Sequence, residues 1–468
     1  MRLHCRLAIA GTAVALAAVT GCGSSTEPAQ NSSSTTVDAS ASSGASASSG
    51  ASAEPAYAAT VQPIVEKLMK DNVIPGAVVA IESPTQGNWS ATFGTRVIDE
   101  DQPVTLDDYF RIGSNTKTMT STVILQLVQE GRLALTDPVS TFRDGVPNGD
   151  RITIEQLSDM RSGLYSYSFD PQFNATLDND PQKVWTPDEL LDIAFSHPVN
   201  FAPGERFEYS NTNIVLLGLI IEQLTGESAA DAFQERIFEP LGLSHTSLPA
   251  AADASIPTPH PQGYSFGTNV STIDTFVLPE PQQSEALAGT LKPNDETDAN
   301  PSWTWTAGGA ISTTADMVTY VKALVGGGLL NEDMQKQRLS SIQPTDPSNP
   351  DAAGYGLGIA RFGPSLIGHD GQIPGYMTVM VNDPKTDLTI VIATNLATVP
   401  TGEGSALVLL KGIIPTFYGA GADTGGNPAG VPSSGETSVQ PTLPPSVVPP
   451  PVAPPSVAPP PVAPSPTP

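Results

Sequence analysis

The strongest constraint on how this chain folds is the composition of its two ends, which cannot build a hydrophobic core. Residues 23–55 contain runs such as SSSTT and SASSGASASSGASA, and residues 421–468 are dominated by proline. Segments this poor in apolar bulk do not bury enough surface to offset the entropy of folding. Between residues 56 and 420, regular apolar runs alternate with Gly and Pro turns, and no long linker divides them. We therefore predict one folded domain over residues 56–420.

The first 22 residues have the layout of a bacterial export signal. Arg2 and Arg6 precede an apolar stretch, residues 7–19, that is too short to span a bilayer. The stretch leads into the sequence VTGC, which resembles the lipobox, where the peptide is cut before a cysteine that carries acyl chains. This resemblance implies a signal peptide over residues 1–21 and a lipidated Cys22. The alternatives are an ordinary signal peptide cut nearby or an accidental cysteine.

Lipidation of Cys22 predicts a protein held at the extracytoplasmic side of the cell membrane. Two or three acyl chains anchor a protein stably, since each buried methylene contributes about 0.8 kcal/mol. Residues 23–55 would then be a flexible tether with a reach of about 30 Å. The chain contains two cysteines, Cys5 and Cys22. Cys5 would leave with the signal, so we expect no disulfide within the mature protein.

The proline-rich tail repeats a ten-residue unit. Residues 445–454 read PSVVPPPVAP, and residues 455–464 read PSVAPPPVAP. Such a segment favours a polyproline II conformation. It could bind a partner, cross the cell wall, or serve as a stiff solubilising tail without a specific ligand. The sequence leaves its partner unknown.

The charge of the chain excludes one class of partner. The formal net charge is −27, and loss of the two signal arginines makes the mature chain more negative still. A chain this acidic is repelled by nucleic acid and by anionic lipid surfaces. We therefore expect no nucleic-acid partner. The charge says nothing about the fold or the chemistry.

The first chemical motif is Ser-x-x-Lys in the segment FRIGSNTKTMTSTVILQLVQ, residues 110–129. Its apolar spacing predicts a helix that runs to about Gly131, with Ser114 at its start. There the free N–H groups and the helix dipole stabilise negative charge on the serine oxygen. Lys117, three residues on, lies on the same face. A buried lysine loses its proton readily and can then accept the serine proton. The alternative is that Ser114 merely caps the helix.

The second motif is Tyr-x-Asn in the segment PGERFEYSNTNIVLLG, residues 203–218, which we expect to enter an apolar helix at Asn213. Tyr209 and Asn211 are two residues apart, so both can face one cleft. A phenol near a lysine can be partly ionised or hydrogen-bonded, and can pass protons to a leaving group. Asn211 offers a donor and an acceptor to a substrate amide. Viewed alone, this pattern also fits packing plus a helix cap.

The third motif is His-x-Gly in the segment LIGHDGQIPGYM, residues 366–377, between β-like runs that we predict over 355–362, 376–381 and 388–393. His369 and Asp370 precede Gly371, which lets a substrate backbone approach the strand closely. Gln372 then offers a backbone N–H to an oxyanion.

The three motifs occur once each and in an order similar to that of class C β-lactamases and related D-alanyl-D-alanine peptidases. Further segments look like the carboxypeptidase-type members of this group, and they are LSDMRSGLYSYS, YSNTNIVLLGLIIEQLTG, WTAGGAISTTADMVTY and YGLGIARFG. The resemblance implies an α/β (α+β) fold in two parts. One part is an antiparallel sheet covered by helices from both ends of the chain, and the other is a mainly helical insertion. The serine lies at their junction.

The third motif departs from the family pattern. The resemblance places a threonine where this chain has Asp370, and often another hydroxyl where it has Gln372. Those hydroxyls help to hold a substrate carboxylate. We therefore predict that the Asp370 carboxylate disfavours substrates that end in a free carboxylate.

The sequence as a whole predicts a serine hydrolase that forms an acyl-enzyme on Ser114. Lys117 and Tyr209 would move protons, with His369 as a further catalytic residue. Substrates would be a cell-envelope peptide, a β-lactam or an ester, so that a D-alanyl-D-alanine carboxypeptidase and a carboxylesterase of the same fold both stay open. A non-catalytic envelope protein that binds peptidoglycan or penicillin is the rival from another class. The pattern implies no cofactor and no metal, because no His, Cys or carboxylate cluster has ligand spacing.

Overall fold

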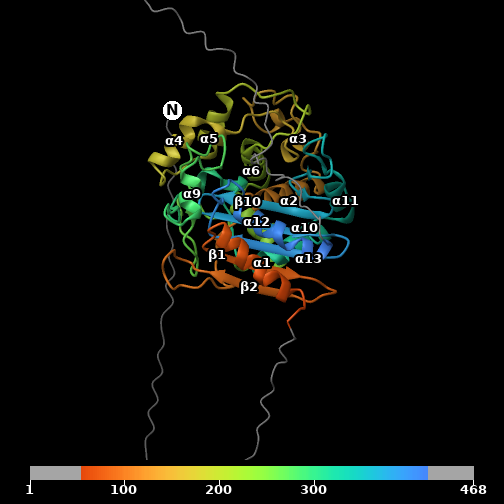
Figure 1. Ribbon diagram of the computed structural model, residues 1–468. Coiled ribbons are helices and arrows are strands. Elements are labelled where there is room, and N and C mark those ends of the chain that lie inside the picture. The colour runs from red at the N-terminus through yellow and green to blue at the C-terminus, as the bar shows by residue number, and fades with distance from the viewer. Residues whose placement is uncertain (1–53, 420–468) are drawn as a thin grey trace, which may run out of the picture. The chain divides into compact units, whose positions relative to one another are not determined.

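Residues 54–419 are described by a computed structural model of the protein (Figure 1). The predicted signal peptide, Cys22 and the proline-rich tail lie outside these residues. Within residues 54–419, no helix is both long and apolar enough to cross a membrane.

The centre of the fold is an eight-stranded antiparallel sheet in the order β2-β1-β12-β11-β10-β9-β8-β7. Its members are β1 (Gly76–Glu82), β2 (Trp89–Gly94), β7 (Gln343–Pro344), β8 (Ala353–Tyr355), β9 (Ala360–Phe362), β10 (Leu366–Ile373), β11 (Tyr376–Asn382) and β12 (Thr389–Thr394). The N-terminal strand β1 pairs with the C-terminal strand β12 along its whole length. The two ends of the domain therefore meet in one sheet.

Helices cover both faces of this sheet, which explains why the central strands β11 and β12 are mostly apolar. Every residue of β11 and β12 is buried, as expected for strands with both faces packed. The covering helices are α1 (Ala58–Asp71), α10 (Thr314–Gly326), α11 (Glu332–Ser340), α12 (Ser405–Ile413) and α13 (Pro415–Tyr418). In α1, Val61, Val65 and Met69 recur every four residues and are buried, so one stripe of the helix faces the core. Helices α1 and α12, from opposite ends of the chain, pack against each other.

The second part of the fold is mainly helical, and several of its helices lie above the sheet in the view of Figure 1. It contains α2 (Thr116–Gln129), α3 (Ile154–Ser158), α4 (Pro171–Asn179), α5 (Pro187–Phe195), α6 (Asn211–Thr225), α7 (Ala229–Phe233), α8 (Glu239–Leu241) and α9 (Gln282–Leu287). Two short pairs of strands accompany these helices, β3 (Phe110–Arg111) with β6 (Ile311–Ser312) and β4 (Tyr264–Ser265) with β5 (Asn294–Asp295). The predicted architecture, an antiparallel sheet with flanking helices and a helical insertion, is confirmed.

Two local predictions need correction. The expected β-like run over residues 355–362 is two short strands, β8 and β9, because a hydrogen bond from Gly356 N to Ile359 O closes a turn between them. Helix α6 begins at Asn211, two residues before the expected start.

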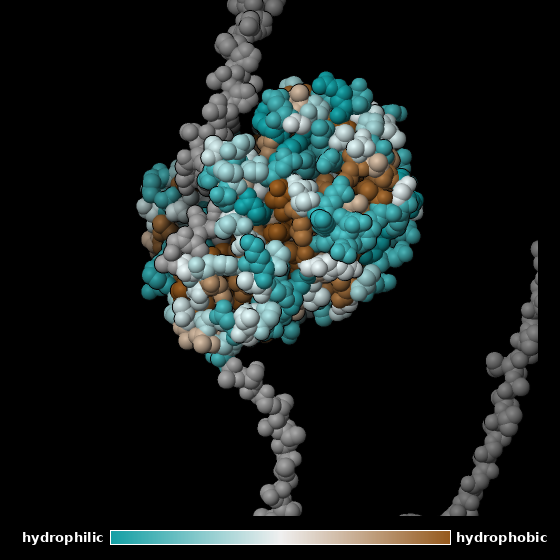
Figure 2. Space-filling model, turned by 90° about the vertical axis from the view of Figure 1, so that its right-hand side faces the viewer, coloured by the Kyte–Doolittle hydropathy of each residue, from teal (hydrophilic) through white to brown (hydrophobic). Residues whose placement is uncertain are grey.

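The surface is largely hydrophilic on the face shown in Figure 2, with hydrophobic residues gathered in a recess near its centre. This pattern agrees with the acidic composition of the chain, which carries 48 Asp and Glu residues against 21 Lys and Arg.

Candidate active site

Ser114 lies in a short 3-10 turn, η1 (Gly113–Asn115), that leads directly into α2. Gly113 has a φ of +51°, a conformation that residues with a side chain rarely adopt. Ser114 is partly exposed, whereas Gly113 and Asn115 are buried. The hydroxyl therefore reaches the surface of an enclosed turn at the start of a helix, where backbone N–H groups stabilise negative charge. The predicted position of Ser114 is confirmed.

Lys117 reaches back from the first turn of α2 to the serine. Its Nζ lies 2.8 Å from Ser114 Oγ and 2.6 Å from the carbonyl oxygen of Ala307, the last residue of η6 (Trp305–Ala307). A carbonyl oxygen can only accept a hydrogen bond, so Lys117 donates to Ala307. In the neutral amine, the lone pair is then free to accept the proton of Ser114.

The surroundings of Lys117 favour the neutral amine. Its side chain is completely buried. Burial lowers the pKa of Lys117 well below its ordinary value, and the carboxyl group of Asp370 counteracts part of this shift. A lysine that loses its proton readily can serve as a general base next to a weak nucleophile. The geometry thus places a buried amine beside a serine hydroxyl, as the Ser-x-x-Lys spacing predicts.

Tyr209 lies just before α6, with Lys117 Nζ 4.8 Å from the centre of its ring. Burial raises the pKa of Tyr209 well above its ordinary value, and the nearby phenol of Tyr355 raises it further, while Ser114 offsets part of the shift. The phenol oxygen makes no hydrogen bond of ordinary geometry to the described residues. The structure therefore favours a protonated phenol over the partly ionised one considered from the sequence. Such a group can donate a proton and is a poor base.

Asn211 is the first residue of α6, and its side chain is partly exposed. Its backbone N–H donates to Ser166 Oγ at 3.1 Å, and its side-chain Nδ2 donates to Ser168 Oγ at 3.2 Å. Ser168 lies within the 3-10 turn η3 (Tyr167–Phe169) and Ser166 just before it, so this turn fixes the orientation of the amide. Its role in binding a substrate amide stays a prediction.

His369 and Asp370 are buried on β10, with 0% and 2% of their surface exposed. His369 Nδ1 lies 2.5 Å from the carbonyl oxygen of Asp370, and His369 Nε2 lies 3.0 Å from the hydroxyl of Tyr355. Burial lowers the pKa of His369 to about 3, against the effect of the hydrogen bond to Asp370. Neither ring nitrogen is left free for a substrate in this arrangement.

Asp370 changes one expectation from the sequence. Burial raises the pKa of its carboxyl group to about 7, and a hydrogen bond with its own backbone and the charge of Lys117 counteract part of the shift. Oδ1 makes no hydrogen bond within residues 54–419. We expected a carboxylate that repels substrate carboxylates, but a group with this pKa is close to half protonated at neutral pH. Any repulsion must therefore depend on pH.

Gly371 and Gln372 lie against the turn that carries the serine. A Cβ on Gly371 would come within 2.0 Å of the carbonyl oxygen of Ile112 and within 2.8 Å of Ser114 N, and a Cβ on Gly113 would come within 2.9 Å of Gln372 N. Gly371 was expected to let a substrate approach the strand, whereas in the structure the turn that carries Ser114 occupies this space. The close packing of the two segments therefore places the backbone nitrogens of Ser114 and Gln372 near each other. Two N–H groups beside a nucleophile are the arrangement that an oxyanion hole needs.

Two groups at the site were not identified from the sequence. The carbonyl of Ala307 belongs to a segment with no motif of its own, although WTAGG was among the segments that resemble the family. Tyr355 was expected only as a strand residue. Its ring lies edge-on to both Tyr209 and His369, with centres 6.1 Å and 5.6 Å apart. No spacing rule links a single tyrosine to a histidine 14 residues later, so the contact emerges from the fold alone.

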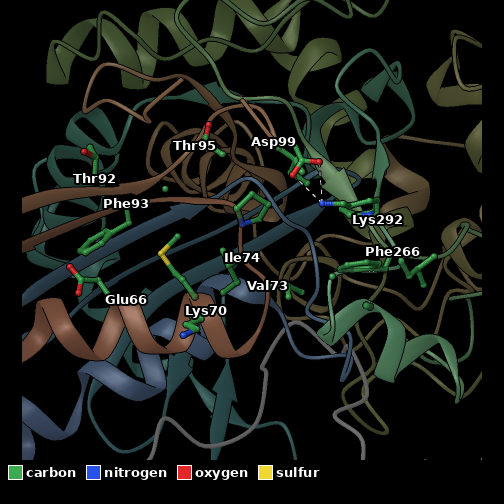
Figure 3. Close-up of a pocket in the computed structure, with 18 residues that line it drawn as sticks. Glu66, Lys70, Val73, Ile74, Thr92, Phe93, Thr95, Asp99, Phe266 and Lys292 are labelled. Carbon is green, nitrogen blue, oxygen red and sulfur yellow. Dashed lines mark hydrogen bonds and ion pairs between the residues drawn. The ribbon is translucent and has the colours of Figure 1, made fainter. Parts of the chain in front are cut away.

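A separate cavity of about 610 Å³ lies away from these residues, and Figure 3 shows its lining. It is bounded by the C-terminal end of α1, the end of β2 and the segment 286–293. Phe93 and Phe266 contribute to its apolar lining, and at one end Lys292 Nζ lies 3.1 Å from Asp99. None of the candidate catalytic side chains lines it. Over residues 54–419, no three His, Cys, Asp or Glu side chains are grouped as a metal site would require.

Comparison with known families identifies the chain. A model of the family described as Beta-lactamase matches residues 61–411. The chain belongs to the β-lactamase family. The resemblance seen in the three motifs is thereby confirmed, and the family's members are serine hydrolases that include amidases and peptidases.

Several individual proteins are similar over most of the domain. Penicillin-binding protein 4* of Bacillus subtilis (strain 168) is 26% identical over 343 residues, which cover 72% of this chain and 71% of that protein. Other curated relatives are longer, and the chain spans 62% of their length. Among solved structures, the D-stereospecific amidohydrolase from Streptomyces sp. is 29% identical with a TM-score of 0.63. The match covers 77% of this chain and 99% of the amidohydrolase chain. The D-amino acid amidase from Ochrobactrum anthropi SV3 is 26% identical with a TM-score of 0.63, over 76% and 99% of the two chains.

Proposed function

We propose that this protein is a serine hydrolase that cleaves amide bonds next to D-amino acids through an acyl-enzyme on Ser114. The observation that carries the proposal is the distance of 2.8 Å between Ser114 Oγ and the buried Nζ of Lys117. A hydroxyl is a weak nucleophile at neutral pH, and an adjacent base with a lowered pKa activates it.

In the proposed reaction, neutral Lys117 takes the proton of Ser114 while the serine oxygen attacks the substrate carbonyl. The backbone N–H groups of Ser114 and Gln372 hold the oxyanion, and removal of one such donor typically lowers kcat by about 100- to 1000-fold. Tyr209 donates a proton to the departing amine, because its raised pKa keeps the phenol protonated. The proton that Lys117 took from Ser114 then passes to the Tyr209 phenolate, which restores both groups. Water attacks the acyl carbonyl, its OH leaves with the acyl group as a carboxylic acid, and its other proton goes to the serine oxygen.

The environment separates the roles of the two titratable side chains. Burial lowers the pKa of Lys117 and raises that of Tyr209. The uncharged form is favoured in both cases, so the lysine becomes a base and the tyrosine an acid. Pairs of groups whose pKa values are pushed apart in this way are typical of acid and base assignments in enzymes.

The similar structures support the choice of substrate. Two of them are a D-stereospecific amidohydrolase and a D-amino acid amidase. A similar curated protein is a penicillin-binding protein. These names support amides of D-amino acids as the substrate class proposed here, and the penicillin-binding protein makes a β-lactam a reasonable covalent probe.

The location of the enzyme is part of the proposal. We infer that Cys22 is lipidated after removal of residues 1–21 and that the domain acts at the extracytoplasmic side of the cell membrane, on cell-envelope peptides. The support is the arginine-flanked apolar stretch that ends at the lipobox-like sequence VTGC.

The test is a comparison of four substrates with the full protein: a D-amino acid amide, an N-acyl-D-Ala-D-Ala peptide, a neutral ester and a chromogenic cephalosporin. We expect hydrolysis of the amide or the peptide, and loss of at least 1000-fold in Ser114→Ala. Ser121→Ala is the matched control, since Ser121 is buried on the same helix and its hydroxyl has no partner among the described residues. Turnover that persists in Ser114→Ala would contradict the proposal. Hydrolysis of the ester alone would identify a carboxylesterase.

A further inference from the structure

The side chains of Tyr355 and His369 meet next to the ring of Tyr209. Both are completely buried, and the hydroxyl of Tyr355 lies 3.0 Å from His369 Nε2. The rings of His369 and Tyr209 have centres 6.4 Å apart. A histidine enclosed in this way has only its hydrogen-bond partners to determine where its proton lies.

The partners of His369 determine its tautomer. Nδ1 lies 2.5 Å from a backbone carbonyl oxygen, which can only accept a hydrogen bond, so Nδ1 must carry the proton. In the neutral ring, Nε2 is then a bare acceptor. The Tyr355 hydroxyl, 3.0 Å away, is the donor that satisfies it. An Nε2 proton would instead require Tyr355 to turn its own hydrogen to another buried acceptor.

We propose that Tyr355 is a positioning residue: its hydroxyl donates to Nε2 and, together with the Asp370 carbonyl oxygen at Nδ1, locks His369 as the neutral tautomer protonated on Nδ1. The proposal rests on the function proposed above and adds a residue to it. It also assigns the leaving-group proton to Tyr209, because a His369 held in this form has no Nε2 proton to give.

The reason lies in the charge that develops during the reaction. When Ser114 attacks, Lys117 takes up a proton and becomes a buried cation. A neutral imidazole does not oppose this cation, whereas an imidazolium would repel it. The groups that surround His369 are Lys117 from α2, Asp370 on the same strand, Tyr355 from β8 and Tyr209 before α6. Of these, Asp370 changes its charge near neutral pH, because its pKa is raised to about 7, and Lys117 becomes charged when it takes the serine proton. A fixed neutral ring adds no third charge beside them.

A defect in this lock should appear in kcat and not in KM. The lock acts on a charge that exists in the transition state and not in the bound ground state. Tyr355→Phe removes one hydroxyl and keeps the ring that packs on Tyr209. We expect kcat for amide hydrolysis to fall at least tenfold, with KM changed less than threefold.

The matched control is Tyr376→Phe. Tyr376 is as completely buried as Tyr355, and its hydroxyl donates to the carbonyl oxygen of Pro261 at 2.8 Å. Its loss removes an equivalent buried hydrogen bond outside the site. We expect kcat and KM of this variant to stay within twofold of the wild type.

The decisive readout is spectroscopic and does not require turnover. Nitrogen NMR of the full chain labelled with [15N]histidine distinguishes protonated from bare ring nitrogens, and His369→Gln identifies the signals of His369. In the wild type, we expect a protonated Nδ1 and a bare Nε2 without titration from pH 5 to 9. In Tyr355→Phe, the Nε2 signal should shift, while Tyr376→Phe leaves it unchanged.

Three results would overturn the proposal: titration of His369 between pH 5 and 8 in the wild type, a proton on its Nε2, or an unchanged kcat in a folded Tyr355→Phe protein. If the wild type hydrolyses no substrate, the proposed function fails, yet the NMR signals still decide the tautomer. The same wild-type spectra decide it if Tyr355→Phe does not fold.

Discussion

The buried carboxyl group of Asp370 should make substrate choice depend on pH. Its pKa is raised to about 7 by burial, so the group is mostly protonated at pH 5.5 and mostly ionised at pH 8.5. The carboxylate can repel a substrate carboxylate only in the higher range. The kcat/KM for peptides that end in a free carboxylate should therefore fall relative to that for neutral substrates as the pH rises through 7.

The size of this electrostatic repulsion can be worked out from the spacing of residues along β10. Gln372 is two residues beyond Asp370 and partly exposed, and residues two apart on a strand are separated by about 7 Å. A substrate carboxylate seated beside Gln372 would thus lie about 7 Å from Asp370. At an effective dielectric of about 20, the repulsion is about 2 kcal/mol, or roughly thirtyfold in rate. Complete screening by water would leave less than about 1 kcal/mol.

The assay compares two substrates that differ in one group, N-acyl-D-Ala-D-Ala and its C-terminal amide. The ratio of their kcat/KM values cancels the titration of Lys117, which affects both. We expect the ratio of acid to amide to fall at least tenfold between pH 5.5 and 8.5 in the wild type. In Asp370→Asn and Asp370→Thr, the ratio should stay flat. A wild-type ratio that changes less than twofold over this range would refute the reasoning.

Three further predictions follow from the site and the N-terminus. Gly371→Ala should lower kcat/KM at least 100-fold in a folded protein, because its Cβ would come within 2.0 Å of the Ile112 carbonyl oxygen and displace η1; kinetics together with circular dichroism test this, and full activity would contradict it. Lys117→Met should abolish hydrolysis and lower the free energy of unfolding in urea by no more than about 2 kcal/mol, because burial already favours the uncharged amine and the variant mainly loses the hydrogen bonds to Ser114 and Ala307; a loss of about 3 kcal/mol or more would count against a neutral Lys117. Cys22→Ala should move the protein from the membrane fraction to a soluble or uncleaved form, and unchanged detergent partitioning would exclude the lipid anchor.

Much of the fold follows from local patterns in the sequence. The apolar runs at 376–381 and 388–393 predicted β11 and β12 because strands buried on both faces are mostly apolar. The prediction of a single strand over 355–362 was wrong, because its apolar residues do not indicate the hydrogen-bonded turn that divides it. The spacing of apolar residues therefore predicts which residues are buried, but it does not predict where a turn interrupts a strand.

The candidate site also has features that the sequence predicts and features that it does not. The contact of Ser114 with Lys117 was predictable, because residues three apart meet on one face of a helix. The ionisation of Tyr209 and Asp370 was not, because a pKa depends on burial by segments distant in the sequence. The same holds for Tyr355, whose partner His369 lies on another strand of the sheet.

The most direct test of the central claim is the intact mass of the protein after incubation with a β-lactam and, separately, with a fluorophosphonate. We predict one covalent adduct with at least one of the two reagents, located on Ser114 by peptide mapping. The adduct should be absent from Ser114→Ala and form much more slowly in Lys117→Met. An unmodified protein with both reagents, or an adduct that persists in Ser114→Ala, would contradict the claim that Ser114 is an activated nucleophile.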